Sequence, residues 1–275
     1  MMMSEMICKY NKDGFLINEN TFSNEEIEFL SYETEKLATL NSPGLVKEEH
    51  LTGVRSIIGA NKLSNVMDCL SKDPRLLYTA QKLLRNDELY IHQYKINMKR
   101  AFTGDVWDWH SDFFYWNIED GMPEPKALTA AIFLDDVNDF NSPLLIVPGT
   151  QEDKLTTEHH VRPYGDMDCG ENWEITFSTK LKHEISRSYL TSIINKNGLT
   201  AVKGKRGTVV FFHCNVIHYS NFNASPWDRR IIFITYNLTS NALKLVTSPR
   251  PEFLASRNFT PIQAGEISSF LKYSK

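Results

Sequence analysis

The sequence predicts a mainly β protein, a sandwich or barrel of short strands with N-terminal helices packed on one side. Three observations predict this class. Residues 1–88 place apolar side chains at helical spacing, the period changes to two near Leu89, and several short runs rich in β-branched and aromatic residues follow. The first pattern is typical of amphipathic helices and the other two of strands. Helices followed by many strands favour a β core with one helical face.

Two helices stand out in the first 88 residues. Ser23 and Glu26 form a capping-box pattern before an apolar stripe, which ends at a Ser-Pro-Gly turn at residues 42–44. The second helix is expected over residues 73–84, where leucine and alanine recur at helical spacing after an Asp-Pro pair. We therefore expect residues 1–88 to be mainly helical.

The strands are expected from residue 89 onward. Between Leu89 and Met98 the residues alternate, so Gln93, Lys95 and Asn97 share one face of a strand. The stretch from 178 to 194 is helix-like but weakly periodic, and we expect it to decorate a long connection. Further strands are expected at Leu128–Leu134, Leu144–Val147, Thr208–His213 and Ile231–Tyr236.

The chain has no repeat and no linker rich in proline, glycine or serine that would divide it. We therefore expect one domain over residues 1–275, in which 1–88 support the core, 89–240 form it and 241–275 extend it. A hydrophobic fraction of 41% is enough for a large core, and barrel domains of roughly 200–250 residues are common.

Charge and cysteine content exclude several classes of function. With 30 basic against 34 acidic residues the formal net charge is −4, which disfavours a nucleic-acid or membrane partner. The four cysteines form no CxxC pair, which favours reduced thiols in a cytoplasmic protein. The N-terminus is too polar for a secretory signal, and no window approaches a membrane span. The oligomeric state stays open.

A candidate metal site comes from three residues. His110 and Asp112 are two apart, so on an extended strand both side chains point to one face. His218 follows a short hydrophobic strand, 106 residues after Asp112, and Arg229 follows His218 by 11. Two histidines and one carboxylate on one side of a metal leave three positions open, as in non-haem Fe(II) oxygenases.

A lone His-x-Asp pair is more often a surface hydrogen bond than a ligand pair. The hypothesis of a metal site therefore depends on His218 and Arg229. A dicarboxylate cosubstrate that chelates iron at one end needs a cation at the other. Arg229 offers a planar fork that is always charged. Thr129 and Ser220 add hydroxyl donors.

Five segments resemble a known family. They are HQYKINMKRAFTGDVW (92–107), WDWHSDFFYWNIEDGMPEPKAL (107–128), PLLIVPGT (143–150), YNLTSNAL (236–243) and PRPEFLASRNFTP (249–261). They resemble the phytanoyl-CoA dioxygenase superfamily of Fe(II)/2-oxoglutarate oxygenases, most of all the bacterial L-proline trans-4-hydroxylases and next the ectoine hydroxylases. The resemblance covers about residues 75–262.

The resemblance implies a double-stranded β-helix, a jelly roll of the cupin type, with Fe(II) as the metal and 2-oxoglutarate and O₂ as cosubstrates. Its implied iron ligands, which are also the catalytic residues, are His110, Asp112 and His218. The resemblance implies that Arg229 and Lys95 contact 2-oxoglutarate, while Thr129 and Ser220 are candidate hydroxyl donors to it and Trp107 is a candidate shield. The implied substrate pocket contains Gln93, Asn97, Tyr115, Trp116 and Phe212.

Several of these roles have plain structural alternatives. The face with Gln93 and Lys95 has the same alternation if it is a solvent-facing edge. In the sequence, Trp116 and Trp107 are indistinguishable from aromatic residues that only pack in the core. His159, His160 and His183 lie in polar stretches and are expected to be solvated. Cys214 is expected to be buried and inert.

The expected activity is hydroxylation of a small free amino acid, with L-proline at C4 as the preferred substrate and succinate and CO₂ as co-products. Phe114-Tyr115 stands where ectoine hydroxylases have Glu-Thr, which argues against ectoine. His213 stands where relatives usually have aspartate, so any contact from that position is in question. The alternatives are a hydroxylase of pipecolate, a branched aliphatic amino acid or ectoine, and a cupin-like binding protein without turnover.

Overall fold

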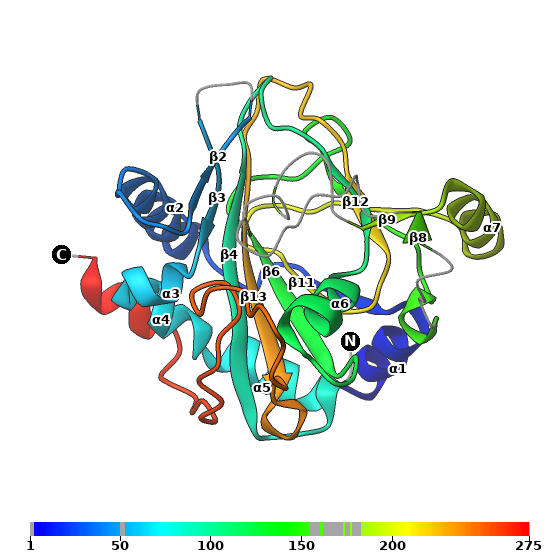
Figure 1. The fold of residues 1–275 in the computed structure, drawn as a ribbon. Helices are drawn as coiled ribbons and strands as arrows, with labels where there is room; N and C mark the ends of the chain where they lie inside the picture. Colours follow the sequence, from blue (N-terminus) through cyan, green and yellow to red (C-terminus); the bar gives the residue numbers. More distant parts are fainter. Residues whose placement is uncertain are drawn as a thin grey trace.

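The computed structural model describes residues 3–49, 53–153, 160–161, 173, 177 and 183–274. Within this part of the chain, two antiparallel sheets stack beside a layer of helices (Figure 1). A further two-stranded pair joins β8 (His160–Val161) to β9 (Glu184–Ile185). The predicted mainly β architecture with N-terminal helices packed on one side is confirmed, and α7 (Arg187–Asn197) lies on the opposite side, beside β8 and β9 (Figure 1).

The larger sheet has seven strands and contains most of the predicted ones. Its centre is the long pair of β4 (Leu89–Lys99) and β13 (Arg229–Leu238), which are antiparallel over nearly their whole length. Across the sheet the strands run β1 (Phe15–Asn18), β11 (Val209–His213), β6 (Ala127–Phe133), β13, β4, β3 (Val54–Ile58) and β2 (Leu45–Lys47).

Both faces of this sheet are buried, because alternate residues belong to two apolar clusters. Ile234 packs in one cluster with Leu30 and Leu76 of the helices. Phe233, its neighbour on β13, packs in the other cluster with Ile146 of the smaller sheet. The helices thus cover one face of the large sheet, and the space between the two sheets lies at the other.

The smaller sheet carries four short strands. They are, in order, β10 (Thr200–Val202), β7 (Leu144–Ile146), β12 (His218–Ser220) and β5 (Trp107–His110). The ladder between β12 and β5 is irregular between His218 and Ser220. β5 ends at His110 and β12 begins at His218, so these two predicted metal ligands lie at adjacent strand ends.

The helices begin where local signals predict. Ser23 caps α2 (Asn24–Ala38) and forms the reciprocal capping box with Glu26, and Asp73 caps α5 (Pro74–Leu84). The remaining α-helices are α1 (Met3–Asp13), α3 (Ala60–Leu63), α4 (Asn65–Ser71), α6 (Asp112–Tyr115) and α7 (Arg187–Asn197). Shorter turns are η1 (Trp116–Asp120, a π-helix), η2 (Thr150–Glu152), η4 (Thr239–Asn241) and η5 (Ser269–Tyr273).

The expectation for residues 1–88 omitted three strands. β1, β2 and β3 lie in this region and extend both edges of the large sheet. Each has only three to five residues, which is too short for the alternation of strands to stand out between strongly helical segments. The helix predicted from 178 to 194 appears as α7, and residues 178–182 lie outside the described part of the chain.

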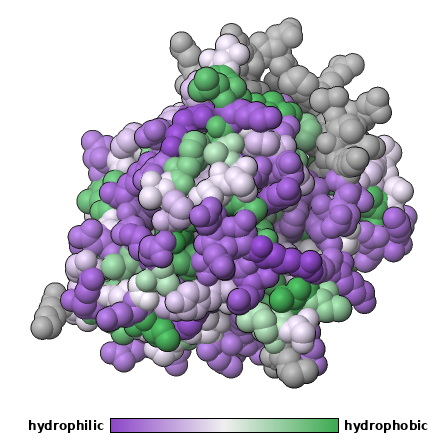
Figure 2. Space-filling model, turned by 90° about the horizontal axis from the view of Figure 1, so that it is seen from below, coloured by the Kyte–Doolittle hydropathy of each residue, from purple (hydrophilic) through white to green (hydrophobic). Residues whose placement is uncertain are grey.

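Figure 2 shows the molecule from below, where hydrophobic residues are scattered in small groups among hydrophilic ones. This face has no large continuous apolar patch, as expected when the apolar faces of sheet and helices pack on one another. None of the helices in the described residues is both long and apolar enough to cross a bilayer.

Candidate active site

The pairing of β5 with β12 brings His110 and His218 together. The two residues are Cα partners in the antiparallel ladder, and their ring centroids lie 4.2 Å apart. Asp112 follows as the first residue of α6. All three side chains are buried, and one nitrogen or oxygen of each lies within 4.8 Å of those of the other two. The structure thus gathers the three predicted ligands at one point.

Backbone carbonyls orient both imidazole rings. His110 Nδ1 lies 2.6 Å from Asp108 O, and His218 Nδ1 lies 3.0 Å from Val216 O. A carbonyl only accepts, so Nδ1–H is the donor in each ring and Nε2 keeps its lone pair for a metal. Burial lowers the pKa of both rings, that of His110 to about 3. Neither ring is therefore protonated near neutral pH.

Asp112 supplies the negative charge of the cluster. Its Oδ1 lies 3.6 Å from Lys95 Nζ, whereas its buried Oδ2 has no hydrogen-bond partner among the described residues. Burial opposes ionisation, but Lys95 and the two histidines outweigh it and hold the pKa of Asp112 below its usual value. A buried carboxylate oxygen without a donor is costly unless a cation meets it. The donor set and this orphan oxygen fit Fe(II).

Two buried cations lie at the other end of β4. Lys99 and Arg229 are Cα partners between β4 and β13, and both side chains are almost fully buried. Lys99 Nζ donates to Ser142 Oγ at 3.0 Å, to Ser220 O at 3.2 Å and to Asn221 O. Arg229 Nη2 donates to Ser220 Oγ at 3.4 Å, and its buried Nε has no partner in the described chain.

Neither Lys99 nor Arg229 forms a salt bridge within the described residues. Burial lowers the pKa of Arg229 to about 9, and burial together with Arg229 lowers that of Lys99 well below its usual value. Two desolvated basic groups without an anion suit the carboxylate of a bound organic acid. The sequence analysis missed Lys99, although it continues the face of Gln93, Lys95 and Asn97 by one more alternate position.

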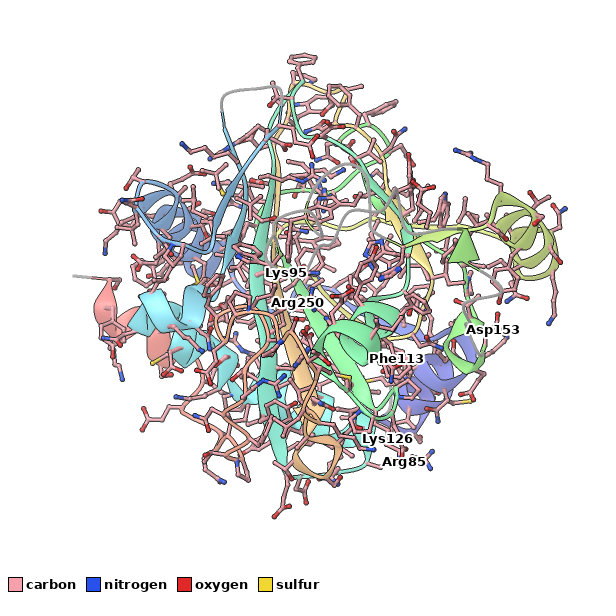
Figure 3. The ribbon with its side chains drawn as sticks, viewed as in Figure 1. Arg85, Lys95, Phe113, Lys126, Asp153 and Arg250 are labelled. Carbon is pink, nitrogen blue, oxygen red and sulfur yellow. The ribbon has the colours of Figure 1, made fainter. Side chains whose placement is uncertain are left out.

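A small cavity of about 30 Å³ lies against the ligand cluster. It is lined by Gln93, Lys95, Trp107, His110, Asp112, Tyr115, Trp116, Phe177 and Arg250. Figure 3 shows Lys95 and Arg250, two of these lining residues, near the centre of the molecule beside β4. Lys95, in the interior of β4, therefore lies beside the iron ligands, whereas Lys99, the last residue of that strand, lies beside Arg229.

Arg250 is a second residue that the sequence analysis missed. Arg250 is buried and donates two hydrogen bonds to the buried Asp120. They run from Nε to Oδ1 at 2.7 Å and from Nη2 to Oδ2 at 2.6 Å. Nη1 makes no hydrogen bond in the described part of the chain, which leaves it for a molecule in the cavity. Arg250 lies in the family-like segment 249–261, but no local spacing links it to the ligands, because only the folded C-terminal segment brings it to the ligand cluster.

The predicted pocket aromatics are all buried, but their surroundings differ. Trp116 lines the cavity and packs edge-on against His92, with 4.9 Å between ring centroids. Tyr115 donates to His183 O at 3.1 Å, and its ring lies 6.4 Å from that of His110. Trp107 lies under the Arg55 guanidinium, and Phe212 packs 5.4 Å from the His218 ring.

Three predicted polar residues have protein partners. Gln93 Nε2 donates to Leu254 O at 3.2 Å while its side chain lines the cavity. Asn97 accepts from Ser56 Oγ at 2.7 Å and does not line the cavity. Thr129 pairs with Thr235 at 2.9 Å on the neighbouring strand. The alternative of a solvent-facing edge for this face of β4 is wrong, because Gln93 and Asn97 are buried.

The remaining histidine and cysteine predictions have mixed outcomes. His183 is not solvated, because it packs against Phe114 and Tyr115 and its Nε2 lies 3.2 Å from Glu119 Oε1. His159 and the side chain of His160 lie outside the described residues. Cys214 is fully buried, as predicted, and burial raises the pKa of its thiol. Cys8, Cys69 and Cys214 are free, and Cys169 lies outside the description.

The phytanoyl-CoA dioxygenase (PhyH) family matches residues 10–231, a range that contains the three ligands together with Lys99 and Arg229. The chain belongs to this family. It is an Fe(II)- and 2-oxoglutarate-dependent dioxygenase, with O₂ as the second cosubstrate.

Relatives within the phytanoyl-CoA dioxygenase family include two kinds of hydroxylase. An ectoine dioxygenase of Bordetella bronchiseptica is 36% identical over 269 residues, which is 93% of this chain and 83% of the relative. An L-proline trans-4-hydroxylase of Streptomyces griseoviridis is 35% identical over 254 residues, 92% of both chains. The chain is thus similar to enzymes that act on small cyclic amino or imino acids.

Solved structures of a family member agree with this fold. EctD from S. alaskensis in its apoform superposes with a TM-score of 0.81 at 32% identity, covering 96% of this chain and 87% of that one. The same enzyme has been solved with 2-oxoglutarate and 5-hydroxyectoine and with bound Fe, at TM-scores of 0.79 and 0.78.

Proposed function

We propose that this dioxygenase hydroxylates a small free amino or imino acid, and that L-proline, hydroxylated at C4 in the trans position, is its first candidate substrate. The observation that carries the proposal is the separation of two cationic sites. Lys99 and Arg229 form one, and Lys95 and Arg250 form the other at the iron ligands. One site suits the distal carboxylate of 2-oxoglutarate, and the other suits the carboxylate of the substrate.

Iron, when bound, would supply the activation of O₂, with electrons from the oxidative decarboxylation of 2-oxoglutarate to succinate and CO₂. The protein's part is to bind and to orient. His110, Asp112 and His218 are the residues that would hold the metal. Arg229 and Lys99, assisted by Ser220, anchor the cosubstrate in this proposal, so the cosubstrate role expected for Lys95 is reassigned to Lys99.

The substrate occupies the cavity in front of the iron ligands in this proposal. Its carboxylate meets Lys95 and the free Nη1 of Arg250, and Gln93 offers an amide near the head group. Trp116 and Tyr115 supply the apolar wall for a small ring. An aromatic wall with a few convergent polar groups is the usual design of a site for a small polar molecule.

Strand order supports the jelly-roll assignment of the core, since two antiparallel sheets face one another with the ligands between them. The lack of a long linker and the apolar clusters shared by helices and sheets support one domain over residues 1–275. A complete ligand triad with Arg229 in place argues against a binding protein without turnover.

Ectoine is the second candidate, because several relatives at this level of identity are ectoine dioxygenases. Phe114-Tyr115 after the ligand pair disfavours it. Both molecules are small rings with one carboxylate, so Lys95 and Arg250 alone do not distinguish them.

A substrate panel separates the candidates. Purified protein with Fe(II) and 2-oxoglutarate is given L-proline, L-pipecolate, a branched aliphatic amino acid or ectoine, and succinate formation is measured before NMR of the product. We expect the largest stimulation by L-proline and a trans-4-hydroxyl product. Stimulation by ectoine alone would move the assignment to ectoine, and no stimulation by any of them would contradict the proposal.

A further inference from the structure

Ser111, the residue between the two ligands His110 and Asp112, has an unusual hydrogen bond. It occupies the N-cap position of α6, where a serine hydroxyl ordinarily accepts from a helix N–H, yet it makes no such cap. Its buried Oγ instead donates to Asn215 Oδ1 at 3.0 Å, and Cys214 O lies 3.4 Å from the same hydroxyl as a second, longer acceptor. The first turn of α6 thus has no side-chain cap, because the Ser111 hydroxyl binds Asn215 instead.

Asn215 lies three residues before the third ligand, His218, and its side chain is fully engaged. Oδ1 accepts from Ser111, and the two protons of Nδ2 go to Gln151 O at 3.0 Å and Asp153 O at 2.8 Å. Asn215 is 4% exposed. The Asn215 side chain therefore links three segments. They are the turn that carries His110 and Asp112, its own turn before His218, and residues 151–153 at the end of η2.

Neighbouring bonds reinforce this junction. Phe113 N–H donates to Cys214 O at 2.9 Å, so the residues on both sides of Asp112 are tied to residues 214 and 215. The Asn215 N–H donates to His213 Nδ1 at 3.1 Å. Burial lowers the pKa of His213 to about 4, so the ring stays a neutral acceptor. His213 thereby makes the local contact that an aspartate side chain makes to the N–H two residues on.

The ladder between β5 and β12 alone does not fix the ligand spacing at this point. The ladder between β5 and β12 has two Cα pairs, at His218↔His110 and Ser220↔Trp107, with an irregularity between them. Asp112 lies beyond the end of β5 and has no strand partner. The Phe113 N–H to Cys214 O bond and the Ser111–Asn215 side-chain bond are two connections between the turn of Asp112 and the segment that leads to His218.

We propose that Ser111 and Asn215 are positioning residues that set the distance between the His110–Asp112 pair and His218 before the metal binds. They touch no metal or substrate and act through the three ligands. Outer contacts of this kind commonly change metal affinity by about 10–100-fold when removed. The inference concerns the iron site and holds whichever small acid is the substrate.

The test is metal titration of the metal-free protein, with Co(II) as an air-stable probe and neither 2-oxoglutarate nor amino acid present. Ser111→Ala removes the link and leaves Asn215 its two backbone contacts, so we expect the Kd for Co(II) to rise about tenfold with a changed visible Co(II) spectrum. Asn215→Asp keeps the acceptor for Ser111 but loses both N–H donors, and it should weaken Co(II) binding too.

Ser225→Ala is the matched control, because Ser225 Oγ donates to Asn223 Oδ1 at 2.8 Å in an equally buried Ser–Asn pair away from the ligands. Thermal melting of the metal-free proteins measures the loss of stability in each variant. We expect similar melting shifts for Ser111→Ala and Ser225→Ala, with the Kd and spectrum changed only in the first. Wild-type Co(II) affinity in Ser111→Ala, or an equal loss in Ser225→Ala, would overturn the proposal.

Discussion

The iron end and the carboxylate-binding end of the site are built in different ways. Two of the three iron ligands are two residues apart in the sequence, and the third, His218, is the direct partner of His110 across one short ladder. The cations come from distant segments: Lys99 meets Arg229 across the long β4–β13 pair, and Arg250 arrives from the C-terminal region. Local spacing therefore marks the candidate metal site, whereas strand register decides which cations lie together.

Replacing an iron ligand should have the largest effect. His218→Ala removes one of two imidazoles from a three-residue set, so we expect turnover to fall to background while the metal-free protein keeps its fold. Bound iron per chain and succinate formation measure the first effect, and circular dichroism measures the second. Near wild-type turnover in purified His218→Ala would show that the ligand assignment is wrong.

Removal of Arg229 should give the next largest effect. Loss of a buried charge-assisted partner typically costs on the order of 2–5 kcal/mol, so Arg229→Ala should raise the KM for the cosubstrate, 2-oxoglutarate, at least tenfold. The KM for the amino acid should change much less, because that carboxylate is assigned to Lys95 and Arg250. Equal increases in both KM values would mean that Arg229 serves the substrate or the fold.

Trp116→Ala should have a smaller effect that separates the pocket from the iron. Without the indole wall the substrate is held loosely, so part of the 2-oxoglutarate turnover becomes uncoupled from hydroxylation. We expect the ratio of succinate to hydroxylated product to rise severalfold, with little change in iron content. A ratio near one would remove Trp116 from the pocket and leave it as a packing partner of His92.

The pH dependence of stability should show the smallest effect. Burial lowers the pKa of His213 from 6.5 to about 4, so between these values the unfolded chain binds a proton that the folded chain does not. The contribution of His213 to the free energy of unfolding is therefore complete above pH 6.5 and is lost as the pH falls toward 4. The loss is at most about 1.4 kcal/mol per pH unit. Denaturant unfolding of metal-free wild type and His213→Asn should give a shallower slope in the variant. Identical slopes would contradict the assignment.

The sequence alone predicts much of this site, for identifiable reasons. The capping box at Ser23, the strand from Leu89 and the His110–Asp112 spacing are local patterns, and the structure contains each of them. Alternation on β4 places Gln93, Lys95, Asn97 and Lys99 on one face but carries no information about distance from the iron. Only the register with β13 separates Lys95 from Lys99.

Other features have no local pattern at all. Arg250 and Asp120 meet across 130 positions, and although each lies in a segment that resembles the family, no local spacing pairs them. The Ser111–Asn215 bond joins two turns that are separate in the sequence and becomes visible only when β5 and β12 pair. The short edge strands β1, β2 and β3 have too few residues for their period to be read beside helices.

The central claim is that two lysines, four positions apart on one strand face, serve two different carboxylates. The most direct test is a comparison of Lys95→Met with Lys99→Met, in which the KM for the cosubstrate and the KM for the amino acid are measured for both variants. The account predicts that Lys99→Met raises mainly the KM for the cosubstrate and Lys95→Met mainly the KM for the amino acid. The same KM rising in both variants, or the reverse assignment, would contradict it.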